Sequence, residues 1–235
     1  MTLKVTTFSS KGRATRIYSH KTKRIHHLQS DNQLKVFLLF EWIDSVKDIK
    51  ENMELKDLET TIYNVENLRL DKFTNKETGQ LYQLHTNFLI KIFKKEKYEE
   101  IAVSVKSLSE LERKTVIEKL EIERRYWKTK NIKFYLITEK EIDKQVVENI
   151  KWVREALIDK SIENKAEIAE KLYYFIQENK DKILQETLDE FDAEEGLEVG
   201  TALFMFRYLI AIKEIYINMK EKIHLNKYIK DIVQL

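Results

Sequence analysis

The order of the elements predicted over residues 84–138 restricts the folds that this chain can adopt. Three strand-like segments and one long helix follow one another closely in this region. The segments 84–93 and 99–106 are rich in apolar and β-branched residues and are joined by a charged turn, which is typical of a β-hairpin. A capping signal at Ser107 and Glu110 then begins a helix to about residue 130, and residues 133–138 form a third strand. A strand–helix–strand connection of this length predicts a right-handed crossover between parallel strands. We therefore expect an α/β domain with a mixed sheet and flanking helices.

A second helix is predicted upstream of this region, beginning at Ser30. Ser30 and Gln33 have the S-x-x-Q spacing of a capping box, in which each end residue accepts a hydrogen bond from the backbone of the other. The residues that follow are apolar around most of the helix circumference: Leu34, Val36, Phe37, Leu38, Phe40 and Trp42. A helix without a polar face is typically buried, so we expect this one in the core.

The chain changes character at about residue 159, where the strand signal mostly disappears. Amphipathic helices are predicted over 165–179, 182–191 and 199–212, and the end of the chain could hold a short β-wing and a closing helix. We therefore expect two domains: an α/β domain over residues 1–158 and a smaller, mostly helical, winged-helix-like domain over residues 159–235. The acidic run 181–200 could be solvated or could face a basic partner.

Composition excludes several classes of protein. The chain has no cysteine, so it has no disulfide framework, no thiolate nucleophile and no cysteine-ligated zinc. No apolar run of 18 residues and no signal peptide is present, so we expect a cytoplasmic protein without a membrane span. The pair His26–His27 lacks acidic or cysteine neighbours, which favours packing or a phosphate contact over a zinc site.

Charge is distributed unevenly along the chain although the formal net charge is only +2. Residues 1–30 hold seven basic residues and no acid, which predicts a basic arm that contacts a polyanion or, alternatively, a solvated tail. Phosphate contacts of this kind position a protein on nucleic acid without reading its sequence. The candidate DNA-binding residues are Arg13, Arg16, Lys21, Lys23 and Arg24.

The predicted elements are also the parts of a PD-(D/E)XK nuclease core: a core helix, a hairpin that ends in Lys106, and a crossover helix. In such sites an acid on the helix, an acid on the first strand and a third ligand two residues before the lysine converge on Mg²⁺. Oxygen ligands hold this hard cation, and the metal activates water and stabilises the charge that grows on the phosphate. The lysine supports both tasks. The pattern alone has little specificity.

Longer motifs follow one another over residues 12–153. They are GR at 12–13, RIYSHKT at 16–22, RIHHL at 24–28, FEW at 40–42, VKDI at 46–49, TNFLI at 86–90, EKLEIERRYW at 118–127, ITEKEI at 137–142 and NIKW at 149–152. In this order they resemble the TnsA family, the endonuclease subunits of heteromeric bacterial transposases, and residues 200–211 resemble the winged-helix domain at the end of that family.

The resemblance implies a subunit that, in active relatives, cuts the 5′ strands at transposon ends with Mg²⁺, or Mn²⁺ in its place. It also implies three partners: DNA, a DDE-type transposase, TnsB, which cuts and joins the 3′ strands, and an AAA+ regulator, TnsC, which docks on the C-terminal domain. The catalytic positions depart from the family. Gln33 replaces a helix glutamate, Asn87 a strand aspartate and Ser104 a glutamine, and only Lys106 is as expected.

These departures remove two negative charges from the expected metal shell, so we expect the chain to bind the catalytic metal poorly and to have little or no nuclease activity. Whether it is an enzyme stays open at this point. The substitutions are consistent with natural degeneration of the site or with deliberate inactivation of a Mg²⁺-dependent endonuclease. A third explanation is that Glu123 on the crossover helix, or Glu41 on the first helix, has replaced a lost ligand. A winged-helix DNA-binding regulator, in which the N-terminal domain only dimerises, is a further alternative.

Overall fold

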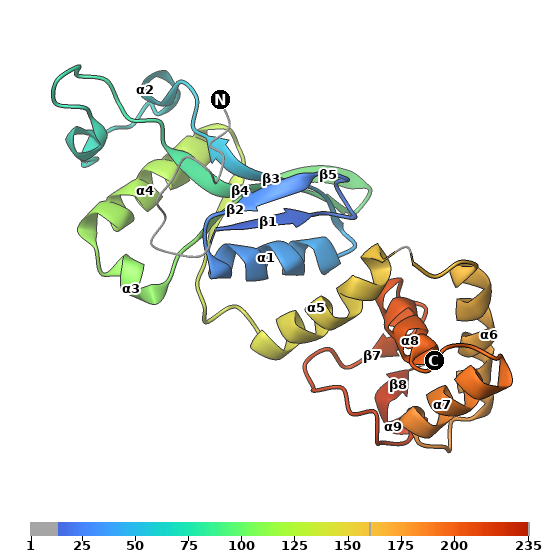
Figure 1. Cartoon of the computed structure of the whole chain (residues 1–235). Helices are drawn as coiled ribbons and strands as arrows, with labels where there is room; N and C mark the ends of the chain where they lie inside the picture. The colour runs from blue at the N-terminus through green and yellow to red at the C-terminus, as the bar shows by residue number, and fades with distance from the viewer. Residues whose placement is uncertain (1–13, 160, 235) are drawn as a thin grey trace. The chain divides into compact units, whose positions relative to one another are not determined.

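The computed structural model describes residues 14–159 and 161–234, which form two compact units (Figure 1). The first unit ends at Ile142 and the second begins at Asp143, so the expected boundary near residue 158 is wrong. The reason is α5 (Lys144–Ile158), which packs along α8 (Thr201–Ala211) of the second unit. The buried side chains of α5 form an amphipathic stripe that could have packed on either unit, so the sequence did not determine its partner.

A four-stranded mixed sheet in the order β3-β4-β5-β6 forms the centre of the first unit. The predicted hairpin is confirmed as the antiparallel pair β4 (His85–Lys94) and β5 (Lys97–Val105). The predicted crossover is also confirmed, because β6 (Lys133–Ile137) lies parallel to β5. β3 (Val46–Glu54) is an edge strand that pairs antiparallel with β4 and was not predicted.

The helices of the first unit position the sheet residues that matter below. The predicted buried helix is α1 (Asp31–Trp42), and the predicted crossover helix is divided at Arg113 into α3 (Leu108–Leu111) and α4 (Lys114–Thr129). The inner face of α4 packs its Ile122, Tyr126 and Trp127 in one hydrophobic cluster with sheet residues. Short helical segments, α2 (Leu58–Thr61) and η2 (Leu70–Phe73), lie between β3 and β4.

The expected basic arm contains an ordered hairpin, β1 (Thr15–Tyr18) paired with β2 (Ile25–Leu28). His26 fastens this hairpin to the sheet, because its buried ring contacts Glu51 of β3 through Nδ1 and Thr22 through Nε2, each at 2.7 Å. Arg24 donates to both carboxylate oxygens of Glu51, at 3.0 and 2.6 Å. The packing role expected for His26 is therefore confirmed.

The same cluster predicts a loss of stability in acid. Burial alone would raise the pKa of Glu51, but hydrogen bonds from His26 and Arg24 lower it from 4.5 to about 2. The stabilisation is thus complete above pH 4.5 and is lost as the pH falls through the folded pKa near 2. It amounts to at most about 3 kcal/mol, from about 1.4 kcal/mol per pKa unit.

Urea unfolding between pH 2 and pH 7 checks this prediction. The original chain should lose stability steeply below pH 4.5, and Glu51→Gln, which has no proton to gain, should show a flatter profile. Parallel profiles for the two proteins would contradict the role of Glu51.

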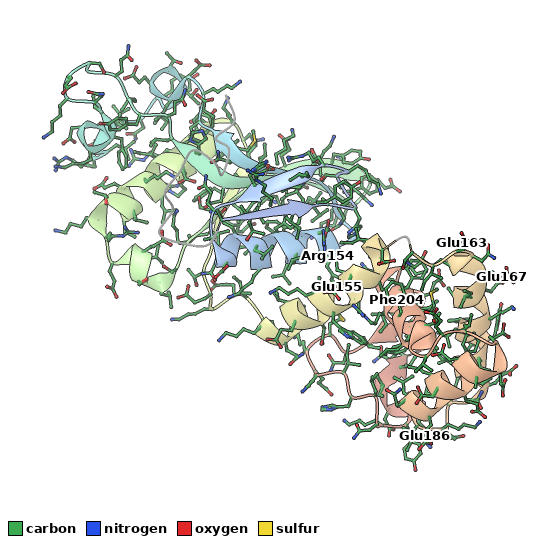
Figure 2. All side chains as sticks on the ribbon, in the orientation of Figure 1. Arg154, Glu155, Glu163, Glu167, Glu186 and Phe204 are labelled. Atoms are coloured by element: carbon green, nitrogen blue, oxygen red, sulfur yellow. The ribbon has the colours of Figure 1, made fainter. Side chains whose placement is uncertain are left out.

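The second unit is mostly helical, and the three predicted helices are confirmed as α6 (Lys165–Glu178), α7 (Leu184–Glu194) and α8. It also contains α9 (Ile229–Ile232) and the two-stranded sheet of β7 (Tyr216–Ile217) and β8 (Val233–Gln234). Buried Asp192 accepts hydrogen bonds from the backbone N–H groups of Gly200 and Ala202, both at 2.7 Å, and so anchors the start of α8. Glu163, Glu167 and Glu186 are exposed on this unit (Figure 2). The winged-helix assignment stays a prediction.

Within residues 14–159 and 161–234, no helix is both long enough and apolar enough to cross a membrane.

Candidate functional site

The sheet brings three of the four expected catalytic positions together where β4 and β5 separate. The β4–β5 ladder extends as far as Phe88 opposite Val103, and Asn87 is the next residue on β4. Beyond that point β5 continues beside β6, and the Val105 N–H donates to Asn87 Oδ1 at 2.7 Å. Ser104 and Lys106 flank Val105, as the x-x-K spacing predicts. The geometry of the expected site is therefore retained at the sheet.

The fourth position, Gln33, lies in the first turn of α1 and is only 8% exposed. Ser30 caps the helix as predicted, because its hydroxyl accepts from the Gln33 N–H at 3.2 Å. The reciprocal bond of a capping box differs from the prediction: Gln33 Oε1 accepts from the backbone N–H of Gln29 at 2.9 Å rather than from Ser30. At both Gln33 and Asn87, the single amide oxygen is therefore used by a backbone donor, and the other end of the amide is an NH₂ group.

Ser104 belongs to a buried polar network centred on Glu123 of α4. The Ser104 hydroxyl and the Thr86 hydroxyl both donate to Glu123 Oε2, the latter at 2.8 Å, and the Trp127 indole N–H donates to Thr86 Oγ1 at 2.8 Å. Glu123 is fully buried, and Lys119 Nζ lies 3.1 Å from its other oxygen. The network therefore pairs the one buried acid of this region with a lysine.

Lys106, the one family-like residue of the four, is largely buried beside a second cation. Burial lowers the pKa of Lys106, and the nearby Lys119 cation lowers it further. Its closest ion-pair partner is Glu110, with Lys106 Nζ 4.0 Å from Oε1. A further cation placed here would be repelled by Lys106 and Lys119. The acids Glu110 and Glu123 are each already paired with one of these lysines.

The residues present do not fit Mg²⁺. Mg²⁺ gives up its water reluctantly even to carboxylates, and here the amide oxygens of Gln33 and Asn87 already accept backbone hydrogen bonds. The Ser104 hydroxyl is directed to Glu123. Over residues 14–159 and 161–234, no group of three or more histidine or acidic side chains could hold a metal ion.

The two acids considered as replacements have other partners. Glu123 is held by two hydroxyl groups and Lys119, as described above. Glu41 lies at the far end of α1 from Gln33, where its Oε1 accepts from the His20 N–H at 3.1 Å and lies 3.3 Å from His20 Nδ1. These contacts give no support to a metal site built on either acid.

The candidate DNA-binding residues divide into three groups. Arg13 lies outside the described residues. Arg16 in β1 and Lys23 in the β1–β2 turn are exposed, as a phosphate contact requires. Lys21 instead donates through Nζ to the carbonyls of Phe40 and Ile43 at the end of α1, and Arg24 binds Glu51. The structure thus gives Lys21 and Arg24 roles in folding that the sequence did not reveal, and their contact with DNA stays a prediction.

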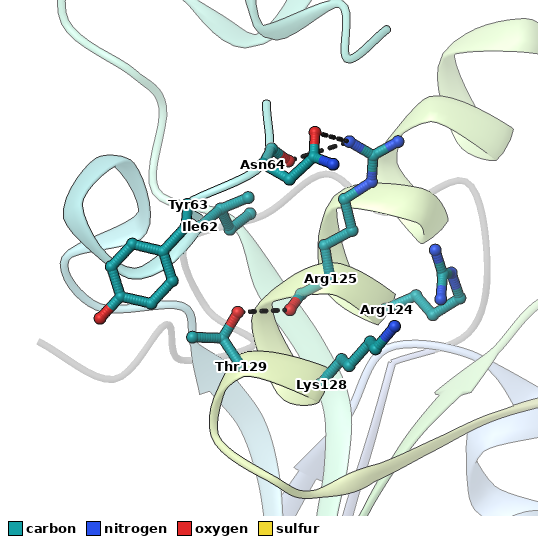
Figure 3. A pocket seen from close by; sticks show the side chains of 7 residues that line it. All are labelled: Ile62, Tyr63, Asn64, Arg124, Arg125, Lys128 and Thr129. Atoms are coloured by element: carbon teal, nitrogen blue, oxygen red, sulfur yellow. Dashed lines mark hydrogen bonds between the residues drawn. The ribbon is translucent and has the colours of Figure 1, made fainter. Parts of the chain in front are cut away.

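A second feature that the sequence analysis missed is a basic pocket on α4. It has a volume of about 550 Å³ and is lined by Ile62, Tyr63, Asn64, Arg124, Arg125, Lys128 and Thr129 (Figure 3). We call it the α4 pocket. The i,i+4 spacing of Arg124 and Lys128 was the available signal, because it places two like charges on one face of a helix.

Comparison with known proteins gives two family matches and one close relative. Residues 44–139 match the model of the TnsA-like endonuclease N terminal domain, and residues 141–219 match that of the TnsA endonuclease C terminal domain. The first match includes Asn87, Ser104 and Lys106 and begins after Gln33. The chain is 36% identical over 221 residues to the Transposon Tn7 transposition protein TnsA of Escherichia coli. That alignment covers 93% of this chain and 78% of the relative.

Proposed function

The chain belongs to the TnsA endonuclease family, and from this premise we propose that it acts at transposon ends as a subunit that binds DNA and its partners but does not cut. The observation that carries the proposal is that Gln33 and Asn87 are uncharged amides, and the oxygen of each already accepts a hydrogen bond from a backbone N–H group. The buried carboxylate of Glu123 is balanced by Lys119. The site therefore retains the family's framework without a donor set for Mg²⁺.

The proposed partners follow from the family and from the division into two units. We propose that the chain assembles on DNA with a DDE transposase of the TnsB type, which would make the 3′-strand cuts and joins. An AAA+ regulator of the TnsC type would dock on the second unit, which the C-terminal family model largely covers. Glu163 and Glu167 are exposed on that unit, and Glu186 of the acidic run 181–200 is exposed at a distance from them (Figure 2). Part of the acidic run 181–200 has a structural role instead, since Asp192 anchors α8.

The proposal predicts DNA binding that does not depend on a divalent cation. The affinity of the full chain for a duplex with the transposon end should not fall when EDTA replaces Mg²⁺, because charged side chains rather than a metal would contact the phosphates. Fluorescence anisotropy measures the affinity, and strand-specific end labels detect cutting. With the partner transposase present, 3′-strand cuts should appear and 5′-strand cuts should not. A metal-dependent 5′-strand cut by this chain would refute the proposal.

A further inference from the structure

The α4 pocket is built by contacts between α4 and the segment that follows α2. Arg125 Nη1 donates to the carbonyl oxygens of Asn64 at 2.9 Å and Glu66 at 2.7 Å, so it fastens this segment against the helix. Tyr63 stands on the same segment with 86% of its surface exposed (Figure 3). The pocket is therefore a hollow with a fixed wall, and Arg125 is the residue that holds the wall in place.

Positive charge exceeds negative charge in this pocket. Its three cations share one acid, because Glu121 contacts Arg124 Nε at 2.6 Å and Arg125 Nε at 2.7 Å. The hydrogen bond from Arg124, and then that from Arg125, lowers the pKa of Glu121 to about 2, so this acid is charged at neutral pH. Two positive charges then remain without a counter-charge among the residues that line the pocket and Glu121.

The stability of the helix explains only part of this arrangement. A cation in the last turn of a helix interacts favourably with the helix dipole, which accounts for Lys128. Arg124 lies further from the helix end, and like charges at i,i+4 destabilise a helix by a few tenths of a kcal/mol. Arg124 donates through Nε and Nη2 to Glu121, and half of its side chain is exposed, so Nη1 is the part of its guanidinium that can reach a ligand in solution.

We propose that the α4 pocket binds a backbone phosphate of duplex DNA, with Arg124 and Lys128 as the contacting cations. A charged guanidinium N–H group such as Nη1 of Arg124 makes a strong hydrogen bond to a phosphate oxygen, and a hollow of about 550 Å³ has room for the phosphate with its neighbouring sugar. The inner face of the same helix carries Lys119 and Glu123, so α4 would link this contact to the former catalytic region. This inference rests on the proposed function, because it assumes that the chain acts on DNA.

The test compares two double variants of the full chain. Arg124→Gln/Lys128→Gln removes the proposed contacts and leaves Arg125 to hold the wall. The matched control, Lys95→Gln/Lys97→Gln, removes the same charge from two exposed lysines, one in the β4–β5 turn and one at the start of β5. Binding to a fluorescent 30-base-pair duplex is measured in EDTA over a series of KCl concentrations. Urea midpoints show that each variant is folded, and Arg124→Lys provides a milder change that keeps the charge.

Each phosphate contact contributes about 0.9 to the slope of log affinity against log salt. The pocket variant should therefore have a slope smaller by about 1 and an affinity at low salt about tenfold lower, whereas the control should keep the original slope. Arg124→Lys should lie between the two. Equal slopes for the pocket variant and the control would overturn the pocket assignment and leave the proposed function standing. No binding of DNA by the original chain would overturn both.

A parallel titration with a polyglutamate peptide separates DNA from an acidic protein partner. If the peptide binds the original chain but not the pocket variant, while DNA binds both equally, the pocket belongs to an acidic protein and the proposal is wrong. If the peptide binds neither protein and the DNA slope falls as expected, the phosphate assignment is supported.

Discussion

Replacing Gln33 with glutamate and Asn87 with aspartate should raise the affinity of the chain for Mn²⁺ and Mg²⁺ by about 100-fold or more. An aspartate at position 87 can still accept from the Val105 N–H with one oxygen and offer the other to a metal, and a glutamate at position 33 can do the same beside Gln29. Two carboxylates also place two negative charges opposite Lys106. The attraction between two opposite unit charges about 4 Å apart is on the order of 4 kcal/mol at intermediate dielectric. This exceeds the free energy that corresponds to the expected change in metal affinity.

Calorimetric titration with each cation checks this prediction without any partner protein. The control is Asn75→Asp/Gln80→Glu, which adds the same charge in the turn between η2 and β4. Binding by the acidic site variant alone would mean that the scaffold still accommodates a metal, and 5′-strand cutting with the partner transposase would be the next measurement. Binding by the original chain would refute the non-cleaving assignment. If neither the acidic site variant nor the original chain binds a cation, the absence of two acids alone does not explain the absence of metal binding.

Ser104 indicates how far the site has diverged. Gln33 and Asn87 have nearly the same shape as the family's glutamate and aspartate. A deliberate inactivation would introduce the same two amides. Ser104 is fully buried and donates to Glu123, so the larger glutamine of the family would have to displace this contact. The Ser104 hydroxyl is part of the hydrogen-bond network of Glu123. This fit with its neighbours favours natural divergence of the site over deliberate substitution of two residues.

The elements that the sequence predicted correctly are those with local signals. The β4–β5 hairpin has a short charged turn, α1 has its Ser30 cap, and the crossover to β6 follows from the order of the elements. The resemblance to the family, rather than spacing alone, identified Asn87 and Ser104, and the predicted hairpin placed them on its two strands, close to Lys106. Alternate residues along a strand place their side chains on the same face of the sheet.

The features that were missed depend on contacts between distant residues. β3 carries many charges and pairs with β4 from about 40 positions away, so its own sequence has no clear strand pattern. Arg24 and Lys21 were assigned to DNA because the partners that hold them, Glu51 and the end of α1, are far along the chain. The α4 pocket needs Asn64 and Arg125 together, at a separation of 61 residues. Charge patterns reveal which residues are basic, and only tertiary structure reveals which of them are already paired.

Among single contacts, we expect the Lys119–Glu123 ion pair to cause the largest loss in the free energy of unfolding when only one of its partners is removed. Lys119→Met leaves a fully buried carboxylate with two hydroxyl donors and without its cation, and such a change typically costs about 3–5 kcal/mol. Glu123→Gln should cost less, because the Lys119 side chain is 25% exposed and its ammonium can be hydrated. The double variant should be more stable than Lys119→Met, since it removes the unpaired charge.

Urea unfolding followed by the fluorescence of Trp127 and Trp42 measures these differences, because both tryptophans lie in the first unit and Trp127 donates to Thr86 within the same network. A Trp152→Phe background, common to all variants, removes the tryptophan signal of the second unit. The three variants and the background protein form a double-mutant cycle, which isolates the Lys119–Glu123 coupling from the other bonds of each residue. A loss below about 1 kcal/mol for Lys119→Met would show that the pair does not stabilise the fold. A loss of the expected size would mean that this pair stabilises the region of the expected catalytic positions without a bound metal.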